Sequence, residues 1–130
     1  MNQRHRGLIA KLHHRAELFE LLARRSPEFI DRLQEAAELL VRCLEQRGKI
    51  LICGNGGSAA QSAHFAAELV NRFRTERPAL AALCLASDIP VLSSIANDYD
   101  YRFVFSRQLE ALAGRGDVLL TLTTSGRSPN

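Results

Sequence analysis

The chain has 130 residues, 46% of them hydrophobic and 24% charged, with a formal net charge of +3. This size and composition predict one globular domain over residues 1–130, with an apolar core of its own. The mild charge, with six Phe, two Tyr and no Trp, argues against a nucleic-acid partner, which usually meets a dense basic stripe with stacking aromatics. No apolar run approaches the roughly 18 residues of a membrane span, so we expect no membrane partner.

The three cysteines, Cys43, Cys53 and Cys84, each lie in an apolar run, and none forms a CxxC pair. This pattern favours buried free thiols over a disulfide framework or a structural zinc site. Free thiols, together with the absence of an apolar signal-peptide segment, predict a cytoplasmic protein.

Two helices are predicted before any strand, within residues 1–48. Leu8, Leu12, Ala16 and Phe19 recur at helical spacing in the first, which covers residues 4 to 24. Ser26 and Pro27 mark the start of the second, whose apolar face continues until Gly48 ends it. Such a helical pair can cover a sheet, and its first helix can equally pack against another subunit.

From residue 49 onward, short apolar strands alternate with helices. The strands are KILIC, ALCL and VLLTL. The helices are a long segment that follows GNGGS and reaches to about Phe73, the segment SDIPVLSSIAN opened by Ser87 or Asp88, and residues 100 to 113. This alternation predicts an α/β fold with a parallel sheet flanked by helices, a flavodoxin-like three-layer sandwich.

The end of the chain raises a question about the extent of the domain. In a 2-1-3 strand order the third strand would need a further strand to cover its edge. Ser128 is a good helix N-cap and Pro129 suits a first helical position, yet no helix follows. Both features predict a C-terminally incomplete form of a longer domain.

Two loops rich in small hydrogen-bond donors, GNGGS and TTSGRS, leave the carboxyl ends of the first and third strands. Ligands of open parallel sheets bind at the carboxyl ends of the strands. Glycines let the backbone approach a phosphate closely, and hydroxyls and the amides of a helix N-terminus can donate hydrogen bonds to it. Tight strand-to-helix turns are the alternative. Gly54, Gly56 and Ala59 fit G-x-G-x-x-A, but the acidic residue that a dinucleotide site expects is missing, and no GK[ST] marks a nucleoside triphosphate site.

A polar line follows on the next helix, where Gln61, His64, Glu68 and Arg72 share one face. A His and a carboxylate one turn apart can share a metal ion or cooperate in proton transfer. A solvated surface pair is the alternative reading.

Taken in order, the segments CGNGGSAAQSAHFAAEL, NRFRTERPAL, IANDYDYRFVFSRQL and GDVLLTLTTSGRSPN closely resemble the phosphoheptose isomerases (sedoheptulose 7-phosphate isomerases) of the sugar isomerase, or SIS, fold. The resemblance covers nearly the whole chain. It implies a five-stranded parallel sheet, a homotetramer, and conversion of sedoheptulose 7-phosphate to D-glycero-D-manno-heptose 7-phosphate for the heptose of lipopolysaccharide in the cell envelope.

The resemblance also implies roles for particular residues. Glu68 would be the catalytic acid or base and would contact substrate, and His64 and Glu68 would bind zinc. The family's remaining active-site groups, a second His and a Gln, come from a later helix that this chain does not contain. The other implied substrate-binding residues are Asn55, Gly56, Gly57, Ser58, Asn97, Asp98, Thr123, Thr124, Ser125 and Ser128.

Two other functional classes compete with the isomerase. SIS-fold relatives that associate with the replication initiator protein serve as tetrameric binding modules, and a sugar-phosphate sensor would bind ligand without turnover. The helical acidic residue tends to be absent from the initiator-associating relatives, whereas Glu68 is present here, which favours the enzyme.

Overall fold

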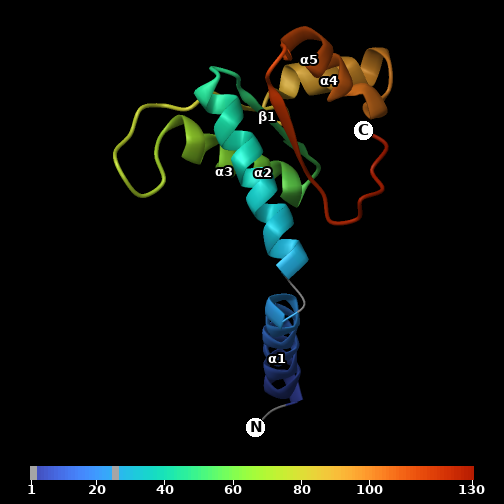
Figure 1. Ribbon diagram of the computed structural model, residues 1–130. Coiled ribbons are helices and arrows are strands. Elements are labelled where there is room, and N and C mark those ends of the chain that lie inside the picture. Colours follow the sequence, from blue (N-terminus) through green and yellow to red (C-terminus); the bar gives the residue numbers. More distant parts are fainter. Residues whose placement is uncertain (1–2, 25–26) are drawn as a thin grey trace. The chain divides into compact units, whose positions relative to one another are not determined.

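The computed structural model describes residues 3–24 and 27–130. They form two compact units, Met1–Glu38 and Leu39–Asn130, which are described separately. The first unit contains helix α1 (Gln3–Arg24) and the beginning of helix α2 (Pro27–Glu45) (Figure 1). Pro27 opens α2, since its fixed φ and missing N–H suit a first helical position, while the predicted start at Ser26 lies outside the described residues. The prediction of one domain over 1–130 stays a prediction.

Helix α2 ends at Glu45 rather than at Gly48, which corrects the sequence prediction. Arg47, with φ 62°, is the residue in the left-handed conformation. The amide of Gly48 donates to the carbonyl of Cys43 and that of Arg47 to the carbonyl of Leu44, which is a Schellman end. Gly48 is required for a different reason: a Cβ there would lie 2.6 Å from the Gly116 carbonyl oxygen.

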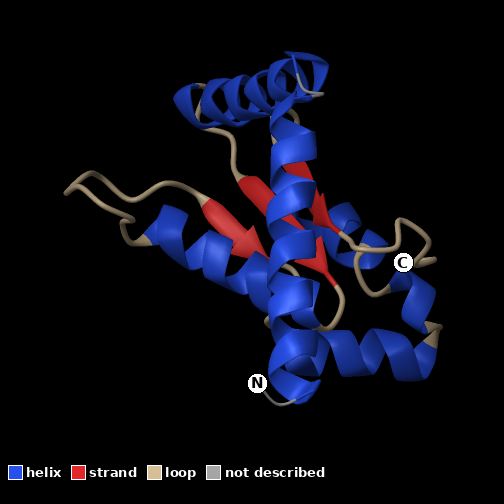
Figure 2. Cartoon of the chain, turned by 90° about the horizontal axis from the view of Figure 1, so that it is seen from below, coloured by secondary structure: helices blue, strands red, loops and turns tan. Residues whose placement is uncertain are grey.

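The second unit is built on a three-stranded parallel sheet of β1 (Ile50–Gly54), β2 (Ala82–Cys84) and β3 (Val118–Leu122). The strand order is β2-β1-β3, with β1 in the middle. Figure 2 shows the strands of this sheet beside one another, in red. Ile52 pairs with Cys84 on one side and with Leu120 on the other. The predicted parallel sheet is therefore confirmed, and its order is the 2-1-3 arrangement considered from the sequence.

Helices cover both faces of this sheet, which confirms the three-layer α/β fold. Alternate residues of β1 point to opposite faces. Ile50 and Ile52 pack with the last turns of α2 and with α3 (Gly57–Val70). Leu51 and Cys53 pack with α4 (Ile89–Asp98) and with the segment leading into α5 (Ser106–Leu112). The strand is buried throughout because both of its faces are covered.

The predicted helix over residues 100 to 113 is in fact two pieces, the short 3₁₀ helix η1 (Tyr101–Phe103) and α5. The Asp100 carboxylate accepts from the Arg102 amide at 2.8 Å and starts η1. Val104 and Phe105 then turn into the core, where both are buried. Burial of these two side chains outweighs continuation of one helix.

Helix α3 is also shorter than predicted, because it ends at Val70 rather than near Phe73. The Arg77 guanidinium donates to the carbonyl oxygens of Glu68 and Leu69 at 2.6 and 2.9 Å. These carbonyls belong to the last turn, which has no further helical donors. A side chain beyond the helix thus satisfies the end of α3.

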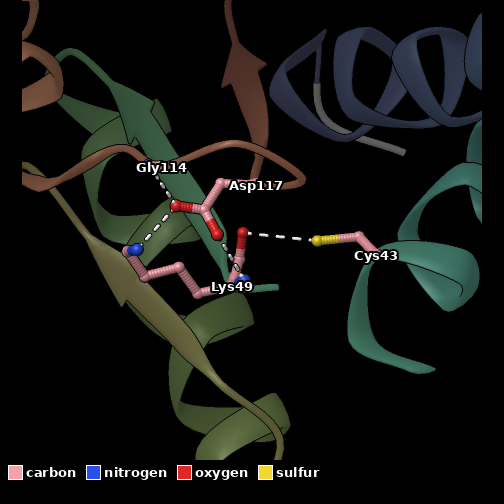
Figure 3. Close-up of polar contacts among 4 residues, drawn as sticks. All are labelled: Cys43, Lys49, Gly114 and Asp117. Atoms are coloured by element: carbon pink, nitrogen blue, oxygen red, sulfur yellow. Dashed lines mark hydrogen bonds and ion pairs between the residues drawn. The ribbon is translucent and has the colours of Figure 1, made fainter. Parts of the chain in front are cut away.

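An ion pair joins the start of β1 to the start of β3 (Figure 3). The Lys49 ammonium lies 2.5 Å from one Asp117 carboxylate oxygen, and the backbone amide of Lys49 donates to the other at 2.8 Å. The Cys43 thiol contacts the Lys49 carbonyl at 3.5 Å. Cys43, Cys53 and Cys84 are buried and free, as predicted. None of the described helices combines the length and the apolar character that crossing a membrane requires.

Candidate functional site

The glycine loop between β1 and α3 has a backbone that only glycine fits at two positions. A Cβ on Gly54 would lie 2.8 Å from backbone atoms of Ser58, because the end of β1 abuts the first turn of α3. Gly56 has φ 54° and ψ −120°, which L side chains rarely adopt. No side chain caps α3. The amides of Ser58 and Ala60 donate to the carbonyls of Asn55 and Gly56, which leaves the N-terminal amides of Gly57 and Ala59 for an anion.

Asn55 lies in this loop and is held by three hydrogen bonds. Its Oδ1 accepts from the Tyr101 hydroxyl at 3.0 Å and from Asn130 Nδ2 at 2.9 Å. Its Nδ2 donates to Asn130 Oδ1, also at 2.9 Å. Residues from three separate segments therefore meet at this one amide.

The Thr/Ser loop after β3 is organised by its own hydroxyls. Thr123 Oγ1 accepts from the Gly126 amide at 3.0 Å, and Ser125 Oγ accepts from the Arg127 amide at 3.2 Å. The hydroxyls of Thr124 and Ser128 make no hydrogen bond to the described residues. Two hydroxyls therefore shape the loop, and two remain available for a ligand.

The two loops line one cavity of about 220 Å³. Asn55 comes from the first loop, and Thr123 and Ser128 come from the second. Ser106, Thr121 and Asn130 add to the polar lining. Cys53 also borders this cavity. Burial raises the pKa of its thiol, which keeps the thiol protonated and disfavours a nucleophilic role. The predicted meeting of the two loops is thus present, and its polar lining is uncharged.

His64 and Glu68 lie side by side on α3, with His64 Nε2 and Glu68 Oε1 3.6 Å apart. The Glu68 side chain is 32% exposed and that of His64 is 75% exposed. Both line a second, larger cavity of about 810 Å³, whose walls include Phe65 and Leu69. Leu122 at the end of β3 borders both cavities, so the acid-base pair and the two-loop cavity adjoin there.

The remaining predicted site residues lie outside these two cavities. Asn97 and Asp98 are exposed at the end of α4, where Asn97 Nδ2 donates to Asp98 Oδ1 at 2.8 Å. Other candidates belong to the two loops without lining a cavity: Gly56, Gly57, Ser58, Thr124 and Ser125.

Sequence reasoning missed Ser106, Tyr101 and Asn130. Tyr101 and Asn130 occur in segments that resemble the isomerases, but no local spacing marks them, since their partner Asn55 is 46 and 75 positions away.

The SIS domain family model matches residues 13–130, so this chain belongs to the SIS domain family. It is 54% identical over 109 residues to the phosphoheptose isomerase of Campylobacter jejuni, covering 84% of this chain and 59% of that relative. It is 53% identical over 123 residues to that of Aromatoleum aromaticum, covering 92% and 62%. The predicted resemblance is confirmed, and the chain spans 59% and 62% of the length of these two relatives.

Two solved structures show the same fold. The phosphoheptose isomerase of Francisella tularensis superimposes with a TM-score of 0.90 at 33% identity, covering 99% of this chain and 66% of that one. The enzyme of Neisseria gonorrhoeae gives a TM-score of 0.81 at 41% identity, covering 95% and 64%.

Proposed function

We propose that this chain supplies the sugar-phosphate site of a phosphoheptose isomerase, which converts sedoheptulose 7-phosphate to D-glycero-D-manno-heptose 7-phosphate. The observation that carries the proposal is the 220 Å³ cavity, in which the glycine loop and the Thr/Ser loop meet. The likeness to relatives named phosphoheptose isomerase supports the choice of reaction.

In this proposal the phosphate lies against Thr123, Thr124, Ser125 and Ser128, with the N-terminus of α3 facing it. Hydroxyls and backbone amides bind an oxyanion through hydrogen bonds without a cation. Asn55, Gly56, Gly57 and Ser58 contact the sugar. Asn97 and Asp98 would have to approach from the end of α4.

Glu68 is the proposed proton carrier. Moving a carbonyl by one carbon removes a proton from the hydroxyl-bearing carbon beside it and returns a proton to the former carbonyl carbon through an enediol. One carboxylate can carry this proton between the two carbons, and a second acid/base group moves a proton between the two oxygens. Glu68 borders the larger cavity beside His64, and this cavity adjoins the loops at Leu122. Its partly exposed carboxylate is accessible to a sugar whose phosphate lies in the smaller cavity.

Zinc at His64 and Glu68 stays a prediction. Across residues 3–24 and 27–130 no group of three His, Cys, Asp or Glu side chains is placed to hold a metal ion. A catalytic zinc usually takes three protein ligands, so the described residues do not form a complete zinc site. We therefore derive no step through a metal ion.

We extend the proposal to the biology of the family. The active form would be a homotetramer in the cytoplasm, and its product would supply heptose for lipopolysaccharide. The initiator-associating alternative is not favoured, since the relatives that match are named as isomerases.

The test is conversion of sedoheptulose 7-phosphate by the wild type and by Glu68→Gln. We expect turnover by the wild type and a loss of at least about 100-fold in kcat for Glu68→Gln, the usual size of a general acid-base contribution. Glu110→Gln, on the exposed side of α5, is the matched control and should keep full activity. A wild type that binds the sugar phosphate without turning it over would be a sensor, and the isomerase proposal would be wrong.

A further inference from the structure

We propose that Asn130 is a second amide donor to the sugar, paired with Asn55, and that Tyr101 is a positioning residue that holds this amide pair in place. The inference rests on the proposed function and deepens it, because it assigns a recognition task to two residues outside the predicted site.

The hydrogen-bond count of the two amides leads to this assignment. Asn55 Oδ1 accepts two hydrogen bonds, from Tyr101 and Asn130, which occupies both of its lone pairs. Asn130 Oδ1 accepts one, from Asn55 Nδ2. Each Nδ2 carries two hydrogens and uses one within the pair. Each amide therefore keeps one N–H without a partner among the described residues.

Both amides line the 220 Å³ cavity together with the Ser128 hydroxyl. Two uncharged N–H donors side by side suit an oxygen with lone pairs, such as a sugar carbonyl or hydroxyl, since each donor can supply one hydrogen bond to it. A bare phosphate already has the hydroxyls and backbone amides of the loops. We therefore assign the amide pair to the sugar part of the ligand and the Thr/Ser loop to its phosphate.

Tyr101 lies outside this cavity and borders a separate hollow with Asp100, Arg102 and Asn130. Its hydroxyl therefore acts on the ligand only through Asn55. The reciprocal Asn55–Asn130 pair has two bonds of the same length and could rotate as a unit. The hydrogen bond from the Tyr101 hydroxyl to Asn55 Oδ1 is a third contact, from a residue outside the pair. It opposes rotation of the two amides and so keeps the free N–H groups of Asn55 and Asn130 toward the cavity.

The experiment compares Tyr101→Phe with Tyr99→Phe in the full chain. Both tyrosines are about equally exposed, at 54% and 60%. The Tyr99 hydroxyl makes no hydrogen bond within the described residues, and its ring is covered by the Arg107 guanidinium at 4.3 Å. Loss of the same oxygen atom therefore removes a hydrogen bond only at residue 101. Asn130→Ala removes the second donor itself.

Titrations with sedoheptulose 7-phosphate and with inorganic phosphate give the readout. We expect Tyr101→Phe to weaken sugar-phosphate binding about 3- to 10-fold, as loss of one hydrogen bond does, and Asn130→Ala to weaken it at least as much. Inorganic phosphate affinity should stay at the wild-type value in both Tyr101→Phe and Asn130→Ala, and Tyr99→Phe should match the wild type throughout. In ¹⁵N spectra of the free protein, the side-chain NH₂ signals of Asn55 and Asn130 should shift in Tyr101→Phe and stay unchanged in Tyr99→Phe. Asn130→Ala should remove the Asn130 signal and shift that of Asn55, whose Nδ2 loses its acceptor.

Other results would contradict the inference. Equal losses for sugar phosphate and inorganic phosphate would mean that the variants disturb the whole loop region rather than a sugar contact. Unchanged sugar-phosphate affinity in both variants would overturn the roles of Tyr101 and Asn130 while leaving the proposed function intact. A wild type that binds inorganic phosphate but not sedoheptulose 7-phosphate would instead refute the proposed function, and the sugar assignment of the amide pair with it, even if the NH₂ signals shift as expected.

Discussion

Lys49 and Asp117, 68 positions apart in the chain, are joined twice: the ammonium and the backbone amide of Lys49 each contact one oxygen of the same carboxylate. A third donor, the amide of Gly114, reaches Asp117 Oδ2 at 2.7 Å. The carboxylate thus ties the turn before β3 to the start of β1 (Figure 3). Two strands that form a parallel pair but lie far apart in sequence are brought into register at their first residues.

We expect Asp117 to make the stability of the protein depend on acidity. Hydrogen bonds from the Lys49 side chain, the Lys49 amide and the Gly114 amide lower the pKa of this carboxyl from 3.8 to about 2. A pKa that is lower in the folded state stabilises the fold fully above the unfolded value, and this contribution is lost as the pH falls through the folded value. Unfolding measured between about pH 5 and pH 2 should show the loss.

Asp117→Asn should be less stable than the wild type at pH 7 and should lose part of the acid dependence in this window. Asp31→Asn, at an exposed site on α2, serves as the control and should keep the dependence. Identical pH profiles for Asp117→Asn and the wild type would show that this carboxyl does not contribute.

Arg47→Gly should stabilise the second unit by about 0.5–1 kcal/mol. A left-handed conformation costs an L residue about 1–2 kcal/mol, and glycine avoids this cost but loses more backbone entropy on folding, which offsets part of the gain. Arg47 has φ 62° at the end of α2. The free energy of unfolding in urea measures the effect. Gln46→Gly, one residue earlier and without a positive φ, should not stabilise. A gain of the same size at both positions would refute the conformational explanation.

Gly54→Ala should destabilise the protein by about 1–3 kcal/mol, the usual cost of an added methylene in a packed region. Its Cβ would meet backbone atoms of Ser58 at 2.8 Å, and a backbone cannot move aside as a flexible side chain can. Gly57→Ala in the same loop is the control, because a Cβ there meets nothing within 4 Å. Chemical denaturation of the two variants should separate them, and equal stabilities would contradict the close approach of β1 to α3.

Asp88→Ala should cost about 1 kcal/mol, the usual value for loss of an N-cap. Asp88 Oδ1 accepts from the Val91 amide at 3.0 Å and so caps α4. The sequence left Ser87 and Asp88 as alternatives, and Ser87→Ala is therefore the natural control, with an expected change within about 0.5 kcal/mol. Thermal unfolding of both variants measures the two losses of stability. A larger loss for Ser87→Ala than for Asp88→Ala would contradict the assignment of Asp88 as the N-cap.

Much of the fold follows from local pattern. The strand Val118–Leu122 is predicted residue for residue, because a continuous apolar run between a GRGD turn and a Thr/Ser loop leaves little choice. The glycine loop and the His64–Glu68 pair are equally local, since chain geometry brings i and i+4 together on any helix. Element ends are predicted less well, as Val70 shows, because the last turn of α3 depends on a partner outside the helix, the Arg77 guanidinium.

The candidate site divides in the same way. The sequence by itself determined that the two donor-rich loops would meet. Each loop follows a predicted strand, and the carboxyl ends of parallel strands lie at one edge of a sheet. Only the tertiary structure decided which side chains complete that edge: Tyr101 and Asn130 reach Asn55 across 46 and 75 positions. Local periodicity contains no information on such contacts, since they form only when the sheet and its helices have packed.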